Sequence, residues 1–339
     1  MTVHFPGKRS MSPPRGKRPV TMADIARLAG VSKITVSRAM SPSALVNERT
    51  REKILQIARK HGYKFNASAR NLRLQRSQTV AVVVEMTPSV DRPMSHPYPL
   101  DLLGGILEEM SGQGLGVLLA TRREILLPSV QSADAVILLG QGAHLDAVRL
   151  FDHLQVPLVI WGAQGVDSGH VTVGSADRQG GSAAAERFIA IGRRSLAFLG
   201  DVSHAELAQR QAGFAEALAP HGLSSHLVRC SGFTVDAGYR ALKTIGPRLQ
   251  YDAVFAGSDL LAMGAIRALG EMNRRVPEDV SVVGYDDSAM AAAFIPALTT
   301  IHQNWVEGGR LLARKAIAMI NGLPVTSEML AVHLVTRAT

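Results

Sequence analysis

Apolar residues recur along the chain with two different periods, and the change of period divides the sequence into two parts. Between residues 21 and 62 they recur every three or four positions, which is the period of an amphipathic helix. From residue 79 onward they form short continuous runs separated by amphipathic stretches. Such runs are typical of strands that are buried on both faces of a parallel sheet. The pattern therefore predicts a small all-α unit followed by a larger α/β unit.

Three amphipathic helices are predicted in the first unit. The first begins after Thr21 and ends at Gly30, the second begins after Ser32, and the third begins after Asn47. Side-chain oxygens at such positions accept hydrogen bonds from the free N–H groups of a helix start. Asp24 stands three residues after Thr21, in a variant of the capping box. This arrangement predicts a helix-turn-helix unit.

The second unit contains seven short apolar runs, at 80–85, 116–120, 135–140, 157–162, 196–200, 253–257 and 280–287. Helical patterns lie between most of these runs, which indicates repeated βαβ units with helices on both faces of a parallel sheet. Seven strands are more than we expect in a single compact parallel sheet. We therefore expect two linked, doubly wound parallel-sheet lobes.

Charge is distributed unevenly between the two units. Residues 1–77 hold 17 Lys and Arg against 3 acidic residues, whereas the remaining 262 residues hold 20 basic and 25 acidic residues. A net charge of +14 on the first part and of −5 on the second follows from these counts. A basic unit on a slightly acidic body indicates a polyanionic partner. A nucleic acid and an anionic membrane surface both fit this charge.

Composition and motifs exclude several classes of protein. The single cysteine, Cys230, cannot form an internal disulfide and suits a reducing cytoplasm. No apolar segment follows the basic N-terminus as in a secretory signal, and no apolar run is long enough for a transmembrane helix. Dinucleotide-binding, P-loop, zinc-protease and nucleophile-elbow motifs are missing, and the histidines show no metal-ligand spacing. We expect neither an enzyme nor a cofactor or metal site.

The second predicted helix carries residues suited to reading DNA. In a helix-turn-helix protein, the N-terminal residues of this helix meet base edges in the major groove. Lys33 and Ile34 would face bases, and Arg38 is long enough to bind a guanine with two hydrogen bonds. Three short hydroxyl groups that suit phosphate oxygens stand beside them, on Ser32, Thr35 and Ser37. The alternative is an ordinary three-helix bundle with a solvated basic face.

A short helix is predicted within residues 66–79, between the two units. Asn66 can cap this helix, and Ala69 and Leu72 lie on it. It is too short and too polar to fold alone in water. Two such segments of a dimer could pair in the minor groove, with each Leu72 inserted between base steps. The alternative is a plain interdomain linker.

The run VTMADIARLAGVSKITVSRAMS, residues 20–41, resembles the DNA-binding head of the lactose-repressor (LacI) family at nearly every fixed position. Ala69 and Leu72 match the family's hinge helix, and 276–288 and 295–303 match its effector domain. The resemblance covers about residues 19–339. It implies a sequence-specific transcriptional regulator, most often a repressor, that binds a near-palindromic operator as a homodimer. A transporter's solute-binding protein is the competing class, but the basic head argues against it.

The resemblance also implies an order of domains. The effector domain of this family is similar to periplasmic sugar-binding proteins, with two α/β lobes joined by three crossovers. We expect a disordered basic arm at 1–19, a helix-turn-helix head at 20–64, a hinge at 65–78 and an effector-binding and dimerisation domain at 79–339. Within that domain we expect lobe 1 to comprise about 79–163 and 293–322, and lobe 2 about 164–292 and 323–339.

In this family a small metabolite binds in the cleft between the lobes. By position, Arg210 and Asp259 match the family's effector-contacting arginine and acidic residue, and Phe233 falls where many members place an aromatic side chain. Asp177 and Trp161 lie at strand ends that would face the cleft. The aromatic residues Phe233 and Trp161 could equally serve only to pack the core.

Three features depart from the family pattern, and a fourth bears on the effector. Ser258 stands where many members have Asn, and the stretch 120–134 is shorter than usual, which changes lobe 1 and part of the dimer surface. The loop at 85–99 is rich in proline, and we expect its His96 and Tyr98 to order the loop rather than to bind the effector.

The Lys33–Ile34 pair is similar to the Lys-Met pair of gluconate-type repressors. The expected partners are therefore operator DNA, a sugar or gluconate-like sugar acid, and a second copy of the chain, in the cytoplasm.

Overall fold

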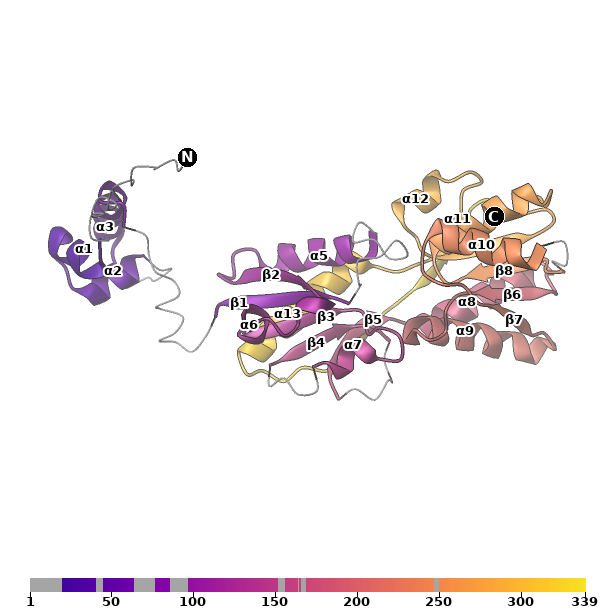
Figure 1. The fold of residues 1–339 in the computed structure, drawn as a ribbon, viewed down its shortest axis with the longest axis horizontal. Coiled ribbons are helices and arrows are strands. Elements are labelled where there is room, and N and C mark those ends of the chain that lie inside the picture. The colour runs from indigo at the N-terminus through magenta and orange to yellow at the C-terminus, as the bar shows by residue number, and fades with distance from the viewer. Residues whose placement is uncertain are drawn as a thin grey trace, which may run out of the picture. The chain divides into compact units, whose positions relative to one another are not determined.

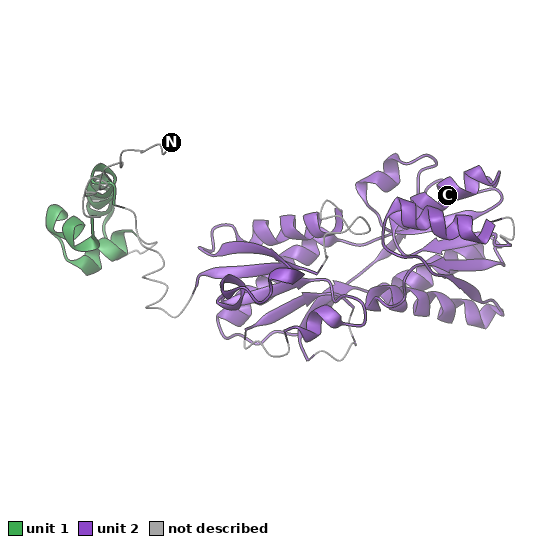
Figure 2. Ribbon diagram, in the orientation of Figure 1, with its two compact units in different colours: residues 1–75 green, residues 76–339 purple. Residues whose placement is uncertain are grey.

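The fold is taken from a computed structural model that describes residues 20–40, 45–63, 77–85, 97–151, 156–163, 165, 169–246 and 250–339. These residues form two compact units, one within residues 1–75 and one within 76–339 (Figure 2). The predicted arm at 1–19 and the predicted hinge contacts Asn66, Ala69 and Leu72 lie outside the described residues.

The described part of the first unit holds helices α1 (Met22–Ala29), α2 (Lys33–Ala39) and α3 (Glu48–Lys60). Ile25, Val36 and Ile54 from the three helices are fully buried against one another. Each predicted cap is confirmed, because the side chains of Thr21, Ser32 and Asn47 accept backbone N–H groups at the starts of the three helices. Polar caps and an apolar stripe on each helix thus account for this small bundle.

The described part of the second unit holds two six-stranded sheets (Figure 1). The first sheet, which defines lobe 1, consists of β1 (Thr79–Val84), β2 (Gly116–Thr121), β3 (Ala135–Leu139), β4 (Leu158–Trp161), β5 (Val171–Ser175) and β11 (Glu328–Leu330), in the order β11-β5-β4-β3-β1-β2. The second sheet, which defines lobe 2, consists of β6 (Leu196–Leu199), β7 (Ser225–Val228), β8 (Ala253–Ala256), β9 (Ser281–Asp286), β10 (Thr299–His302) and β12 (His333–Val335), in the order β12-β10-β9-β8-β6-β7. The pairings are parallel except that of β12 with β10.

Helices cover both faces of each sheet. In lobe 1, α5 (Pro97–Met110) and α13 (Trp305–Ile320) cover one face, and the short helices α6 (Pro128–Gln131) and α7 (Asp146–Arg149) cover the other. In lobe 2, α10 (Val235–Ile245) and α11 (Asp259–Glu271) cover one face, and α8 (Asp177–Ala190) and α9 (Ala205–Leu218) cover the other. The small helix α12 (Ala289–Ala293) and the 3₁₀ turns η1 (Arg122–Glu124) and η2 (Ala219–His221) lie in connections. The predicted fold class is confirmed.

The division between the lobes differs from the predicted bounds. Within the described residues the chain passes between lobes at Ala176, at 303–304 and at 331–332. The bounds expected near 163, 293 and 322 were therefore wrong by about ten residues. The cause is that β5, β10 and β11 are short and partly polar, so they do not stand out as apolar runs. Their place in a sheet depends on pairing with strands far away in the sequence.

The chain enters lobe 1 through a pair of strong hydrogen bonds. The carboxylate of Asp134 accepts the backbone N–H of Ser77 at 2.7 Å and that of Gln78 at 2.8 Å. Gln78 has a φ of +54°, a conformation that few side chains adopt freely. One acidic side chain thus fixes the backbone where β1 begins.

Candidate functional site

The exposed face of α2 brings together the side chains predicted to read DNA. Lys33, Ile34 and Arg38 are exposed, and Ile34 leaves 63% of its surface accessible although it is apolar. Ile34 and Arg38 are four residues apart and therefore share one face of the helix. Val36 and Ala39, on the opposite face, are buried in the head. This division leaves one side of α2 free for a partner.

The predicted phosphate-binding hydroxyls have structural roles as well. The Ser32 hydroxyl oxygen accepts the Thr35 N–H at 3.0 Å and lies 2.8 Å from the Thr35 hydroxyl. Thr21 and Asn47 cap α1 and α3 in the same way. Thr35 and Ser37 are half-buried. The side chains of Ser32, Thr21 and Asn47 therefore mark helix N-termini, whose partial positive charge also suits phosphate groups.

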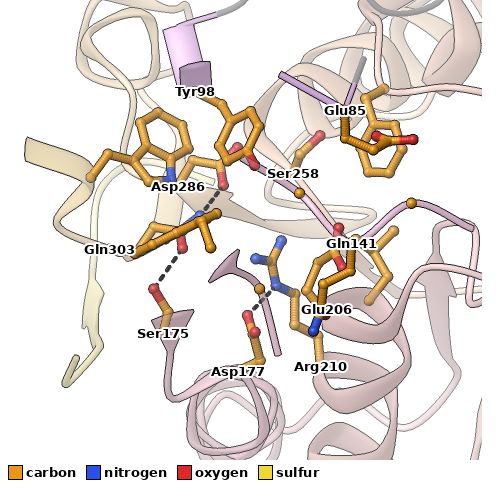
Figure 3. A pocket seen from close by; sticks show the side chains of 17 residues that line it. Glu85, Tyr98, Gln141, Ser175, Asp177, Glu206, Arg210, Ser258, Asp286 and Gln303 are labelled. Carbon is orange, nitrogen blue, oxygen red and sulfur yellow. Dashed lines mark hydrogen bonds and ion pairs between the residues drawn. The ribbon is translucent and has the colours of Figure 1, made fainter. Parts of the chain in front are cut away.

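A second candidate site is a cavity between the two lobes (Figure 3). Lobe 1 contributes an aromatic wall formed by Tyr98 of α5, Trp161 at the end of β4 and Trp305, the first residue of α13. Lobe 2 contributes a mainly polar wall with Asp177, Glu206, Arg210, Ser258 and Asp286, together with Phe233. The predicted site residues Arg210, Asp177, Phe233 and Trp161 thus line one cavity, whereas Asp259 does not.

Arg210 and Asp177 form a buried ion pair on the lobe 2 wall. Arg210 Nε donates to Asp177 Oδ1 at 2.7 Å, and Arg210 Nη1 donates to the Gly257 carbonyl at 2.7 Å. The guanidinium also lies 3.6 Å from the ring centre of Tyr285. Burial alone would lower the pKa of Arg210, but Asp177, Tyr285 and Asp286 raise it above its usual value. Arg210 therefore stays charged.

Burial and Arg210 have opposing effects on the pKa of the Asp177 carboxyl. Burial raises its pKa, while the Arg210 charge and hydrogen bond act to lower it. Both side chains are positioned by close packing of α8 against α9. A Cβ on Gly181 would lie 2.0 Å from the Arg210 carbonyl oxygen, and one on Gly213 would lie 1.9 Å from that of Arg178. Glycine at both positions therefore allows the contact that brings Asp177 to Arg210.

Asp286 is a cavity residue that the sequence analysis did not single out. Its side chain lines the cavity although the residue is only 6% exposed, and its Oδ1 accepts Gln303 Nε2 at 2.7 Å. The Gln303 side-chain oxygen in turn accepts the Ser175 hydroxyl at 2.7 Å. Burial and the neighbouring Asp259 raise the pKa of Asp286 well above its ordinary value. A chain of hydrogen bonds thus links β5, β9 and the crossover after β10 (Figure 3).

The backbone at Asp286 is also strained. Asp286 has a φ of +122° and Asp287 a φ of +54°. Non-glycine residues with such angles cluster at functional sites, where the surrounding structure holds them in place. Their position after the run VSVVGY was a usable signal, since acidic residues at the end of a buried parallel strand face the ligand side of a sheet.

Asp259, which was predicted to contact the effector, lies outside the cavity lining and has structural hydrogen bonds. It is completely buried, and it accepts hydrogen bonds from Ser288 N at 2.7 Å, Ser288 Oγ at 2.9 Å and Thr300 Oγ1 at 2.5 Å. Burial is the main cause that raises the pKa of its carboxyl to about 6. Ser258, one residue earlier, caps α11 and lines the cavity instead. Asp259 supports the cavity wall from behind.

Trp305 places an unsatisfied donor in the cavity wall. The residue is 5% exposed, and within the described part of the chain its indole Nε1–H has no hydrogen-bond partner. Tyr98 packs edge-on against its ring, with the ring centres 6.0 Å apart. Tyr98, expected to order its loop, thus lines the cavity, whereas His96 lies outside the described residues. An acceptor on a bound molecule or an ordered water would satisfy this donor.

Other chemistry is limited in the part of the chain that the structure describes. No group of three or more His, Cys, Asp or Glu side chains there could hold a metal ion, and no helix there is long and apolar enough to cross a membrane. Burial raises the pKa of Cys230 to about 12, so its thiol is a poor nucleophile.

Comparisons with known proteins agree on both units. Residues 21–66 match the family described as "Bacterial regulatory proteins, lacI family", and residues 185–339 match the "Periplasmic binding protein-like domain". The HTH-type transcriptional regulator CelR of Thermobifida fusca is 34% identical, over 95% of this chain and 98% of CelR. The HTH-type transcriptional repressor PurR of Erwinia tasmaniensis is 31% identical, over 84% of this chain and 85% of PurR.

Solved structures show the same similarity. A CelR–cellobiose complex aligns with a TM-score of 0.69 at 32% identity, and the alignment covers 95% of this chain and 99% of that one. A lac repressor dimer bound to operator and the anti-inducer ONPF aligns with a TM-score of 0.83 at 24% identity, over 95% and 99% of the two chains. The second similarity supports the fold.

Proposed function

The chain belongs to the LacI family of bacterial regulatory proteins, and from that premise we propose that it is a DNA-binding repressor of transcription rather than an enzyme. It would act in the cytoplasm as a homodimer on a near-palindromic operator, and a small sugar in the interlobe cavity would control its affinity for DNA. The observation that carries this proposal is the exposed Lys33–Ile34–Arg38 face of α2, on a head whose net charge is strongly positive.

The first prediction concerns DNA binding by the full chain. A DNA fragment selected from a random pool should contain two inverted half-sites and should bind with a dissociation constant in the nanomolar range. Affinity should fall steeply as salt concentration rises, because lysines and arginines displace counterions from phosphates. Gel retardation against a scrambled fragment measures both effects. Equal affinity for the two fragments, or preferential binding to anionic vesicles, would contradict the proposal.

The chemistry of the cavity favours a neutral sugar as effector. Aromatic rings on one wall suit the apolar face of a sugar ring, while carboxylates and hydroxyls on the other suit its hydroxyl groups. Among the described residues that line the cavity, Arg210 is the only Lys or Arg side chain, and it is already paired with Asp177. Glu85, Glu206 and Asp286 add further acidic groups to the lining. The relative CelR was solved with a neutral sugar, cellobiose.

A sugar acid is the competing effector, because the Lys33–Ile34 pair implied a gluconate-like ligand and Arg210 could bind a carboxylate. Matched pairs distinguish the two: glucose against gluconate, and cellobiose against cellobionate. Trp161 and Trp305 are the two tryptophans of the sequence, and both line the cavity, so binding should change the intrinsic fluorescence. We expect the neutral member of a pair to raise the melting temperature. A shift caused only by the acid would favour the gluconate-like ligand.

The second prediction tests the orphaned indole of Trp305. Trp305→Phe keeps an aromatic ring and removes the N–H donor. Its affinity for whichever of the tested sugars gives the largest thermal shift should fall about tenfold, or about 1.4 kcal/mol. The melting temperature without sugar should change little, because removal of an unsatisfied buried donor offsets the cost of the cavity that the smaller ring leaves. Calorimetric titration measures the affinity. Trp161→Phe is the control and should cost less; an equal loss in both variants would show that aromatic area alone matters.

A further inference from the structure

Two loops meet across the cleft, away from the crossovers. The loop after β3 belongs to lobe 1, and the turn before α9 belongs to lobe 2. Ala143 and His204 face each other in an isolated antiparallel bridge, and the His144 N–H donates to the Ser203 carbonyl at 2.9 Å. The helices α7 and α9 follow these two loops in the chain. This backbone contact, formed by Ala143, His144, Ser203 and His204, is called the latch below.

The lobe 1 side of the latch is conformationally strained. His144 and Leu145 have φ values of +53° and +61°, and they are consecutive non-glycine residues. Such residues keep this conformation only where surrounding contacts hold them, and those contacts include the hydrogen bond to lobe 2. Separation of the lobes would remove that contact and let the loop relax. The hydrogen bond from His144 N–H to Ser203 thus joins a strained loop of lobe 1 to lobe 2.

The latch continues directly into the walls of the cavity. On lobe 1, Gly140, Gln141 and Gly142 line the cavity immediately before Ala143. On lobe 2, Glu206 and Leu207 line it two and three residues after His204.

The side chain of His204 adds a second link to the cavity. Its ring packs edge-on against Phe233, with the ring centres 5.1 Å apart, and Phe233 lines the cavity. On the other side, the ring of His204 lies near Asp201, whose carboxylate also accepts the Ser203 N–H at 3.0 Å. The turn that supplies the Ser203 carbonyl is thus itself well fixed.

The crossover residues Ser175 and Gln303 line the opposite end of the same cavity (Figure 3). The lobes are therefore tied together covalently at one end of the cavity and by the latch at the other. A change of the angle between the lobes must break or reform the latch, whereas the crossovers can only bend.

We propose that the latch sets the equilibrium between closed and open lobes, so that its breaking and reforming accompany effector exchange and the change in operator affinity. This inference rests on the proposed effector control, and it assigns a role to residues that need not touch the effector. A two-state element that both sites bias is what transmits a signal between them.

A reversible crosslink tests the geometry. Residues directly opposite in an antiparallel pair have Cα atoms about 4.5–5.5 Å apart, which a disulfide can span. The double variant Ala143→Cys/His204→Cys should form an internal disulfide under mild oxidation, and either single variant should not. Cys230 should not compete, because burial raises its pKa to about 12. A double variant that forms no internal disulfide would overturn the proposal.

A pair of substitutions tests the energetics without DNA or sugar. His144→Pro removes the N–H donor and cannot adopt a positive φ, so it should break the latch. His144→Gly keeps the donor and accommodates the positive φ, so it should preserve the latch. Amide hydrogen exchange at 140–142 and 205–207 should be about tenfold faster in His144→Pro and about tenfold slower in the oxidised double variant. Unchanged exchange in both proteins would overturn the proposal.

The same proteins test the link to DNA on the fragment selected from the random pool. The oxidised double variant holds the latch closed and His144→Pro breaks it. If the latch controls operator affinity, at least one of these two proteins must differ from the unaltered chain. Operator affinity should therefore change at least fivefold in the oxidised double variant or in His144→Pro. A change in the double variant should be reversed when its disulfide is reduced. Normal operator affinity in both would show that the latch does not control DNA binding, and it would leave the assignment of the DNA-binding head intact.

Discussion

Replacement of Arg38 by alanine should lower affinity for the selected operator about 5- to 150-fold and relax the preference at one base pair. The exposed guanidinium on α2 can donate two hydrogen bonds to one guanine, and such a pair contributes about 1–3 kcal/mol to discrimination between bases. Titration of the operator and of single-base variants in gel retardation would reveal both the loss and its position.

Arg27→Ala is the matched control for this prediction. Arg27 is also exposed and lies on α1, where it pairs with Asp24 at 3.0 Å. Its replacement removes the same charge from the head, so any loss should be similar on operator and scrambled DNA. If Arg38→Ala also weakened both fragments equally, Arg38 would bind only phosphate, and the assignment of α2 to the major groove would be wrong.

Removal of the Asp177 carboxylate should have the largest effect on stability. Asp177→Ala leaves the Arg210 guanidinium buried and without its ion-pair partner, and breaking such a pair costs about 3–5 kcal/mol. Chemical denaturation of the full chain should show this loss in the transition of the second unit. Effector binding should also disappear, since both side chains line the cavity.

A double variant separates stability from binding at this pair. Asp177→Ala/Arg210→Met removes both charges, and an apolar replacement of a buried ion pair is often neutral or stabilising. Most of the lost stability should therefore return, while the thermal shift by sugars should remain absent. If sugar binding returned together with stability, the pair would be a structural element of lobe 2 and not part of the effector site.

The head was predictable from local sequence signals. Thr21, Ser32 and Asn47 cap their helices as expected, because a cap depends only on residues within one turn. The buried strands β1, β3 and β8 were equally clear, since they consist of apolar residues that are almost fully buried. Local patterns of this kind can be recognised in the sequence without knowledge of any distant contact.

The cavity was only partly predictable, because its residues depend on distant contacts. Arg210 and Asp177 were placed at the cleft correctly, but their ion pair joins residues 33 positions apart on different helices. Asp259 and Asp286 were harder to distinguish, since both are acidic residues next to the end of a buried strand. Which of them faces the cavity depends on how α11 starts after Ser258 and on the positive φ of Asp286. A pattern of residue types does not encode either.

The two hydrogen bonds that Asp134 accepts from Ser77 and Gln78 bear on how a movement of the lobes could reach the head. The residues that begin the second unit are bound to the first sheet, because the Asp134 carboxylate that accepts Ser77 N–H and Gln78 N–H directly precedes β3, which pairs with β1. The described residues that lead to the DNA-binding head therefore belong structurally to lobe 1. In the proposed homodimer, displacement of lobe 1 would move these residues directly, and displacement of lobe 2 would reach them through lobe 1.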